Sequence, residues 1–134
     1  MKENIINVIF SFFGGLVGFL FGEINEIFYI LIALIVIDFI TGLIKAGFQK
    51  KLNSEVCFKG IIKKFFILVI VSLGHLLDRA IGQAICGNVV MFFYIANESI
   101  SIIENAGIIG LPIPQKIKDI LEQLKEKEDA DESE

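Results

Sequence analysis

Long runs of apolar residues dominate the chain. Residues 5–21 carry no charge and contain only Asn7 and Ser11 as polar side chains, and residues 27–44 are apolar except for one aspartate and one threonine. At about 1.5 Å per residue, helices over these runs would be about 25 and 27 Å long, close to the roughly 30 Å hydrocarbon core of a bilayer. The pattern therefore predicts two membrane-spanning helices, of which the second is more strongly marked.

Two further runs are less uniform. Residues 61–77 include Lys63 and Lys64, so this run spans a bilayer only if both lysines extend their aliphatic stems toward the interface. Residues 84–103 have the length of a span but contain polar groups that must face protein or water. These groups belong to Asn88, Asn97 and Glu98. Four spans are expected, or three if residues 5–21 lie on the membrane surface.

Helix-breaking residues separate the fourth run from the C-terminal segment. Pro114 is suited to open a new helix, because proline fits the first helical position. The breakers are Gly107, Gly110, Pro112 and Pro114, and the apolar stripe that follows at helical spacing is Ile113, Ile117, Ile120, Leu121 and Leu124. Residues 126–134 are charged and have no apolar anchor. Residues 111–134 are therefore expected to form a cytoplasmic amphipathic helix with a solvated tail.

The composition favours a membrane location. Hydrophobic residues make up 54% of the 134 residues, charged residues only 21%, and the mean hydropathy is +0.72. Globular chains are about 45–50% apolar even when glycine is counted, so much of the apolar surface here has to face lipid. We expect an all-α integral membrane protein with three to four transmembrane helices in one domain over residues 1–110, followed by the short amphipathic helix.

The basic residues indicate how the chain is oriented. Most lysines flank the connection over residues 45–60, whereas residues 22–26 hold two acids and no base. Loops rich in lysine stay on the cytoplasmic side, so we expect residues 45–60 and the C-terminus in the cytoplasm. The lysines that set this topology are Lys45, Lys50, Lys51, Lys59, Lys63 and Lys64. Because the lysines flank apolar runs and form no basic face, we expect no nucleic-acid partner.

Three glycines in the first run recur at a spacing of four. Gly14, Gly18 and Gly22 form two overlapping GxxxG patterns, which place all three on one side of a helix and allow another backbone to approach closely. Self-association of the chain is one interpretation. Packing within one molecule, or simple tolerance of glycine in membrane helices, is the other.

Asp38 lies inside the second run, where an ionised side chain costs at least about 2.5 kcal/mol. Thr41 and Gly42 follow three and four residues later, so a carboxylate, a hydroxyl and a gap share one side of the helix. We interpret this group as a polar contact between helices, or as a site where Asp38 lines a pore. The alternatives are a position near the interface or a pair with a lysine.

The fourth run has one polar side. Glu98, Ser101 and Asn105 share a helical face, and Asn97 and Glu104 lie beside it. A helix of this kind lines water or buries its polar side against other helices, and a chain this small offers few of them. Several copies are therefore expected to assemble, and the alternative is a helix that lies flat in the interface. The intramembrane polar candidates are Asp38, Asn97, Glu98, Ser101 and Glu104.

Patterns for catalysis or cofactor binding are missing from the sequence. His75 is the single histidine, and Cys57 and Cys86 lack the CxxC spacing of redox or metal sites. Nucleotide-binding, nucleophile-elbow and zinc-protease motifs do not occur. We expect no enzyme activity, no catalytic residue, no cofactor and no metal.

Four segments together resemble a known family. They are DFITGLIKA at residues 38–46, NS followed by KGIIKK within residues 53–64, NESISIIEN at residues 97–105 and GLPIP at residues 110–114. In this order and spacing they are similar to the toxin secretion/phage lysis holins, over about residues 30–125.

The resemblance implies a small phage-derived protein of the bacterial cytoplasmic membrane. Such a protein forms homo-oligomers in the bilayer and opens non-specific lesions that release a cell-wall-degrading endolysin or a protein toxin, and the host cell then lyses. The functional partner need not touch the holin, an antiholin is a further possible partner, and the family has no cofactor. The residues alone leave two alternatives open: a small ion channel or transporter subunit, and an antiholin or accessory membrane scaffold.

Overall fold

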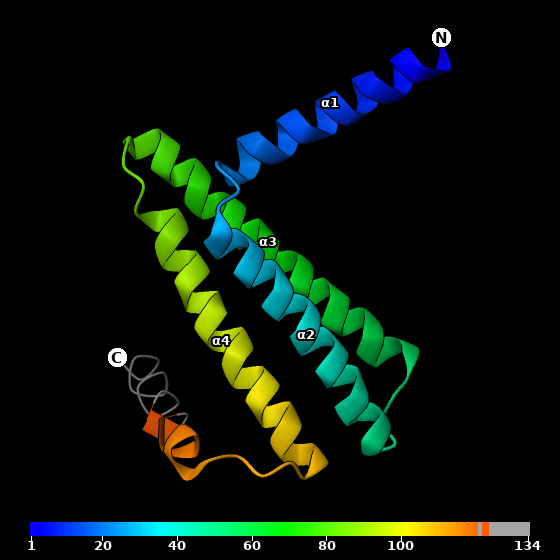
Figure 1. Ribbon diagram of the computed structural model, residues 1–134, viewed down its shortest axis with the longest axis vertical. Helices are drawn as coiled ribbons and strands as arrows, with labels where there is room; N and C mark the ends of the chain where they lie inside the picture. Colours follow the sequence, from blue (N-terminus) through cyan, green and yellow to red (C-terminus); the bar gives the residue numbers. More distant parts are fainter. Residues whose placement is uncertain (121, 124–134) are drawn as a thin grey trace.

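The computed structural model describes residues 1–120, 122 and 123. Within them it contains four long helices: α1 (Lys2–Phe21), α2 (Glu26–Phe48), α3 (Ser54–Ile81) and α4 (Cys86–Ile109) (Figure 1). The described part has no strand, and residues 115–120, 122 and 123 are also helical. The all-α prediction is confirmed. Leu121, Leu124 and the charged tail, which the sequence assigned to the amphipathic helix and its end, lie outside the described residues.

Three of the four long helices are long and apolar enough to cross a bilayer: α1 with 20 residues, α2 with 23 and α4 with 24. The helix α3 is longer, at 28 residues, but Lys63 and Lys64 interrupt its apolar face. The expectation of an integral membrane protein with three to four spans is confirmed, because the described residues contain three candidate spans.

The helices extend past the apolar runs into the polar connections. Instead of a loop over residues 45–60, only residues 49–53 separate α2 from α3. The start of α3 is fixed by Asn53, whose side chain accepts a hydrogen bond from the backbone N–H of Val56 at 2.8 Å. Hydropathy alone misses this extension, because helix caps and polar helical turns carry no apolar signal.

Three helices end in the same way. The residue after the last turn adopts a left-handed backbone in Lys50 (φ 56°), Gly82 (φ 78°) and Gly110 (φ 97°). The following N–H then donates to a carbonyl five residues back, as from Lys51 to Ala46 at 2.8 Å. Glycine adopts this conformation freely, whereas a lysine there is strained.

The helices α2, α3 and α4 form a bundle in which α4 packs against both others, while α1 projects away from it (Figure 1). Leu31, Val71 and Met91, one from each bundle helix, are at most 1% exposed. The α3 backbone lies close to α4 at Gly74, where an added Cβ atom would lie 3.2 Å from the Cα atom of Gly87. We call this region the apolar half of the bundle: Leu31, Ile35, Ile67, Val71, Gly74 and Met91.

The helix α1 has no buried residue. It meets the bundle near its C-terminal end, where the Arg79 guanidinium lies 4.7 Å from the centre of the Phe19 ring. Gly14 and Gly18 have open space around them, and Gly22 ends the helix with a φ of 66°. An apolar helix that the described part of its own chain leaves largely uncovered has to face lipid or another molecule.

The lysines gather at one end of the bundle. The connection between α2 and α3, the end of α4 and residues 111–120 all lie at this end, which is the lower one in Figure 1. Lysines of these segments include Lys45, Lys50, Lys51, Lys59, Lys116 and Lys118. We call it the lysine end.

Candidate functional site: a buried ion cluster

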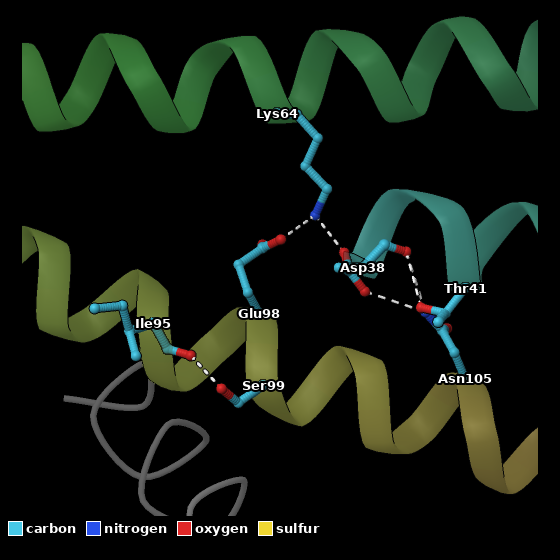
Figure 2. Close-up of polar contacts among 7 residues, drawn as sticks. All are labelled: Asp38, Thr41, Lys64, Ile95, Glu98, Ser99 and Asn105. Carbon is cyan, nitrogen blue, oxygen red and sulfur yellow. Dashed lines mark hydrogen bonds and ion pairs between the residues drawn. The ribbon is translucent and has the colours of Figure 1, made fainter. Parts of the chain in front are cut away.

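A single lysine joins all three bundle helices. Lys64 reaches from α3 and donates to one carboxylate oxygen of Asp38 on α2 and one of Glu98 on α4, as Figure 2 shows. The side chains are only 18%, 8% and 4% exposed, respectively. Two acids thus share one base inside the protein.

The position of the cluster follows from the helical spacing between its residues and the core residues of each helix. Asp38 follows Leu31 by seven residues and Ile35 by three, so it continues the buried stripe of α2. On α3, Lys64 precedes Ile67 by three residues, and on α4, Glu98 follows Met91 by seven. Each charge therefore occupies a core position of its own helix, and the three meet because the apolar half aligns the helices.

Asn105 closes the network from α4. Its side-chain amide donates to Asp38 Oδ1 at 3.1 Å and to Thr41 Oγ1 at 3.0 Å. The Thr41 hydroxyl in turn donates to the Asp38 carbonyl oxygen at 3.1 Å (Figure 2). An added Cβ atom on Gly42 would lie 3.8 Å from the Asn105 amide nitrogen. The aspartate, the threonine and the glycine that the sequence grouped together thus all face α4.

The electrostatics make this a fragile arrangement. Buried charges are tolerated only when they are paired and hydrogen-bonded, and removing one partner of such a pair typically costs about 3–5 kcal/mol. Here Lys64 is the shared partner of both carboxylates. We call this region the polar half of the bundle: Asp38, Thr41, Lys64, Glu98 and Asn105.

The other polar candidates surround the cluster and are less buried. Asn97 is exposed, whereas Ser101 and Glu104 are half-buried. All three line a groove of about 820 Å³ next to Asp38 and Glu98. Whether any of these side chains lines a pore stays a prediction.

Lys64 and Asn105 had roles that the sequence did not reveal. Lys64 was grouped with Lys63 as a lysine that reaches the interface, but Lys64 turns inward while Lys63 is exposed. Helical phase gave no signal that separates them, because Lys63 and Lys64 lie four and three residues before Ile67 and both spacings belong to one helical face. The sequence leaves open a pair of Asp38 with a lysine, and Lys64 is the lysine that binds it.

At the opposite end, Asp78 caps the start of α4. Its carboxylate accepts hydrogen bonds from the backbone N–H groups of Ile85 at 3.0 Å, Cys86 at 2.6 Å and Gly87 at 2.8 Å. Partial burial opposes ionisation, but the N–H groups of Gly87, Cys86 and Ile85 outweigh it and hold the pKa of Asp78 below its ordinary value of 3.8. The His75 ring packs beside this cap, because a Cβ atom added to Gly87 would approach it to 2.7 Å. Both residues therefore have a structural role here.

Comparison with known proteins decides the family. Residues 15–126 match the model of the bacteriophage holin family. The chain belongs to the bacteriophage holin family. Its match begins inside α1 and includes every residue of the ion cluster.

A relative from a phage supports the assignment to the holin family, and the chain also has similar relatives in bacteria. A protein of Bacillus phage phi105, named a probable holin, is 35% identical over 84% of this chain and 83% of its own length. Uncharacterised proteins of Listeria monocytogenes and Clostridium perfringens are 40% and 39% identical, over 81% and 93% of this chain and 79% and 98% of their own lengths. No solved structure matches the chain.

Membership of the holin family supports several expectations in outline. It implies an oligomeric, multi-pass protein of the cytoplasmic membrane with a role in lysis, and it points to a non-enzymatic protein. Within the described residues, no group of three His, Cys, Asp or Glu side chains could hold a metal ion.

Proposed function

We propose that this chain is a lytic holin. Many copies assemble in the cytoplasmic membrane and open non-specific lesions, through which an endolysin or a protein toxin leaves the cell. Neither cargo needs to bind the holin directly. Family membership and the phage relative support the holin role, and the ion cluster suggests how one sequence serves both a closed and an open state.

The observation that carries the proposal is the burial of Asp38 and Glu98 against Lys64. With its charges satisfied internally, the molecule presents an apolar surface to lipid and is compatible with an intact bilayer. When α3 separates from α2 and α4 in the polar half, the carboxylates and the Asn105 amide lose their internal partners. They are then more stable next to water, at the edge of a lesion formed by several copies.

The oligomer contact is assigned to α1. Its apolar surface is uncovered, and Gly14 and Gly18 present a side on which a second helix could approach closely. Gly22 acts instead as the joint between α1 and α2 because of its left-handed backbone. Thr41 and Gly42 serve packing within the bundle through Asn105.

The orientation is assigned from the lysine end. Lysine-rich connections stay in the cytoplasm, and residues 111–120, which follow α4, lie at the same end (Figure 1). The C-terminus is therefore assigned to the cytoplasm, with Lys45, Lys50, Lys51, Lys59 and Lys63 near the cytoplasmic interface.

Inducible expression in a bacterial host tests the function. The chain is expressed with and without an endolysin that lacks its own export signal, while membrane potential and culture turbidity are recorded together. We expect abrupt depolarisation in both cultures and a collapse of turbidity only with the endolysin.

Other outcomes separate the alternative functions. Depolarisation without endolysin release would indicate a small ion channel. Membrane insertion without depolarisation would indicate an antiholin or an accessory scaffold. Either result would contradict the proposed lytic role.

A further inference from the structure

The groove in the polar half has a size and shape that the lesion mechanism does not explain. Its volume is about 820 Å³, and all three bundle helices line it. Along α3 it extends from Val56 to Ile70, which corresponds to about 21 Å of helix. One leaflet of a bilayer has a hydrocarbon thickness of roughly 15 Å. The groove is therefore long enough to follow a lipid chain from the interface toward the bilayer centre.

The groove has an apolar wall and lysines in its lining. The wall includes Phe39, Leu43, Ile62, Phe66 and Ile70, and three further lysines line the groove: Lys45 and Lys59 toward the lysine end, and Lys63 midway along α3. These side chains come from α2 and α3.

The charges of the groove lining are not all satisfied within the molecule. Lys59 binds Glu55 at 2.8 Å, and Lys64, deeper in the groove, is held by the ion cluster. Glu104 is the acid nearest to the lysine end among the lining residues. In the part of the chain that the structure describes, neither Lys45 nor Lys63 forms an ion pair. Lys45, toward the lysine end, and Lys63, midway along α3, leave positive charge on the groove lining that an anion can complement.

We propose that this groove binds one anionic phospholipid, with an acyl chain along the apolar wall and the phosphate at Lys45 and Lys63. Basic pockets between transmembrane helices on the cytoplasmic side bind anionic headgroups, and the apolar wall suits a lipid chain but no soluble anion. The binding site requires membrane insertion only, so its failure and the failure of lesion formation are separate results.

The absence of tryptophan from the chain permits a direct test. Phe66→Trp places one fluorophore in the groove wall, and Phe65→Trp places one on the same helix outside the groove lining. The two positions are similarly exposed, at 55% and 59%. Each full-length variant is reconstituted in phosphatidylcholine vesicles that contain brominated phosphatidylglycerol or, at the same mole fraction, brominated phosphatidylcholine. Quenching of tryptophan by bromine then reports which lipid occupies each surface.

We expect quenching of Phe66→Trp to favour phosphatidylglycerol, and quenching of Phe65→Trp to show no such preference. In the Phe66→Trp background, Lys45→Gln and Lys63→Gln each reduce the relative affinity for phosphatidylglycerol by about fivefold, the effect of one lysine near an anionic headgroup. Lys50→Gln with Lys51→Gln is the matched control, because these lysines lie outside the groove lining, and it leaves the preference unchanged.

Two results would overturn the proposal. One is an equal preference at Phe66→Trp and Phe65→Trp, which would mean general attraction of anionic lipid to the lysine end. The other is a preference at Phe66→Trp that persists when Lys45 and Lys63 are both replaced. Circular dichroism of each variant verifies that the helices are retained.

Discussion

The two halves of the bundle are built from the same three helices but held together in different ways. In the apolar half, Leu31, Val71 and Met91 are fully enclosed, and the α3 backbone approaches α4 at Gly74. In the polar half, Lys64 bridges the helices through an ion cluster beside an open groove. Close packing is spread over many atoms, whereas the cluster depends on a single side chain.

The difference matters because the solvent is lipid. Helices in a bilayer gain little from hydrophobic burial, so their association rests on close packing and on polar contacts between them. Close packing weakens by degrees when one contact is lost. A buried ion cluster fails as a unit, because each remaining charge becomes unfavourable once its partner leaves. The comparison therefore assigns stability to the apolar half and the capacity to open to the polar half.

Replacing Lys64 should have the largest effect. Lys64→Met leaves two buried carboxylates without their cation, and we expect a loss of about 3–5 kcal/mol in the free energy of unfolding. Denaturant titration in lipid bicelles, followed by circular dichroism, measures it. Lys63→Met is the matched control, because this neighbouring lysine is exposed.

The same variant permits a rescue. Adding Asp38→Asn and Glu98→Gln to Lys64→Met removes the unpaired charges, so most of the lost stability should return. If Lys64→Met is as stable as Lys63→Met, the cluster does not hold the polar half together.

Truncating an enclosed side chain in the apolar half should reduce the free energy of unfolding by less. Leu31→Ala leaves a cavity among enclosed side chains, and we expect a loss of about 2–3 kcal/mol by the same titration. Ile30→Ala, one residue away and 44% exposed, is the control and should change little. Equal losses in both variants would mean that the Leu31 side chain is not enclosed.

Loss of the Asn105 amide should weaken the polar half mildly. Asn105→Leu removes its bonds to Asp38 and Thr41, and interhelical hydrogen bonds in membranes contribute about 1 kcal/mol. Because the closed state is weakened, we also expect lysis to begin earlier after induction. Asn97→Leu is the exposed counterpart and should leave the free energy of unfolding unchanged. Unchanged lysis timing in Asn105→Leu would mean that the Asn105 amide does not stabilise the closed state.

The smallest effect is expected outside both halves, at the Asp78 cap. The pKa of Asp78 is lowered in the folded protein, so its contribution to stability is present above its ordinary pKa of 3.8 and is lost as the pH falls through the folded value. Asp78→Asn should therefore reduce stability at neutral pH and flatten its decline in acid, as measured by unfolding titrations over a pH series. Glu23→Gln, an exposed acid at the same end, should leave the pH dependence as it is. If the stability of Asp78→Asn falls in acid as steeply as that of the unaltered protein, the Asp78 cap is not the cause of this pH dependence.

Much of the fold could be predicted from local pattern. The apolar runs located α1, α2 and α4, and the prolines after Gly110 located the helical segment at residues 115–120. Asp38 and Glu98 were singled out because an acid in an apolar run needs a compensating partner. These inferences were possible because helix length, hydropathy and the free-energy cost of a charge in the membrane each depend on a single segment of the sequence.

The partners could not be predicted, because they depend on how segments pack. Lys64 lies 26 residues from Asp38 and 34 from Glu98, and Asn105 lies 67 from Asp38. Lys63 and Lys64 are adjacent and chemically identical, yet about 100° of helical rotation sends one outward and the other inward. The cap by Asp78 was missed for the same reason, since it joins the end of one helix to the start of the next.

The central claim is that the polar half opens during lysis while the apolar half stays closed. Ala46→Cys places a thiol in the groove lining beside the polar half, and Ser72→Cys places one next to Val71 of the apolar half. Both positions are buried, at 6% and 8% exposed, and the background carries Cys57→Ser and Cys86→Ser. Labelling with a water-soluble maleimide before and after the onset of lysis measures the access of water to each half. The account predicts that labelling of Ala46→Cys rises sharply at onset while Ser72→Cys stays protected. Equal labelling of both positions, or protection of both throughout lysis, would contradict it.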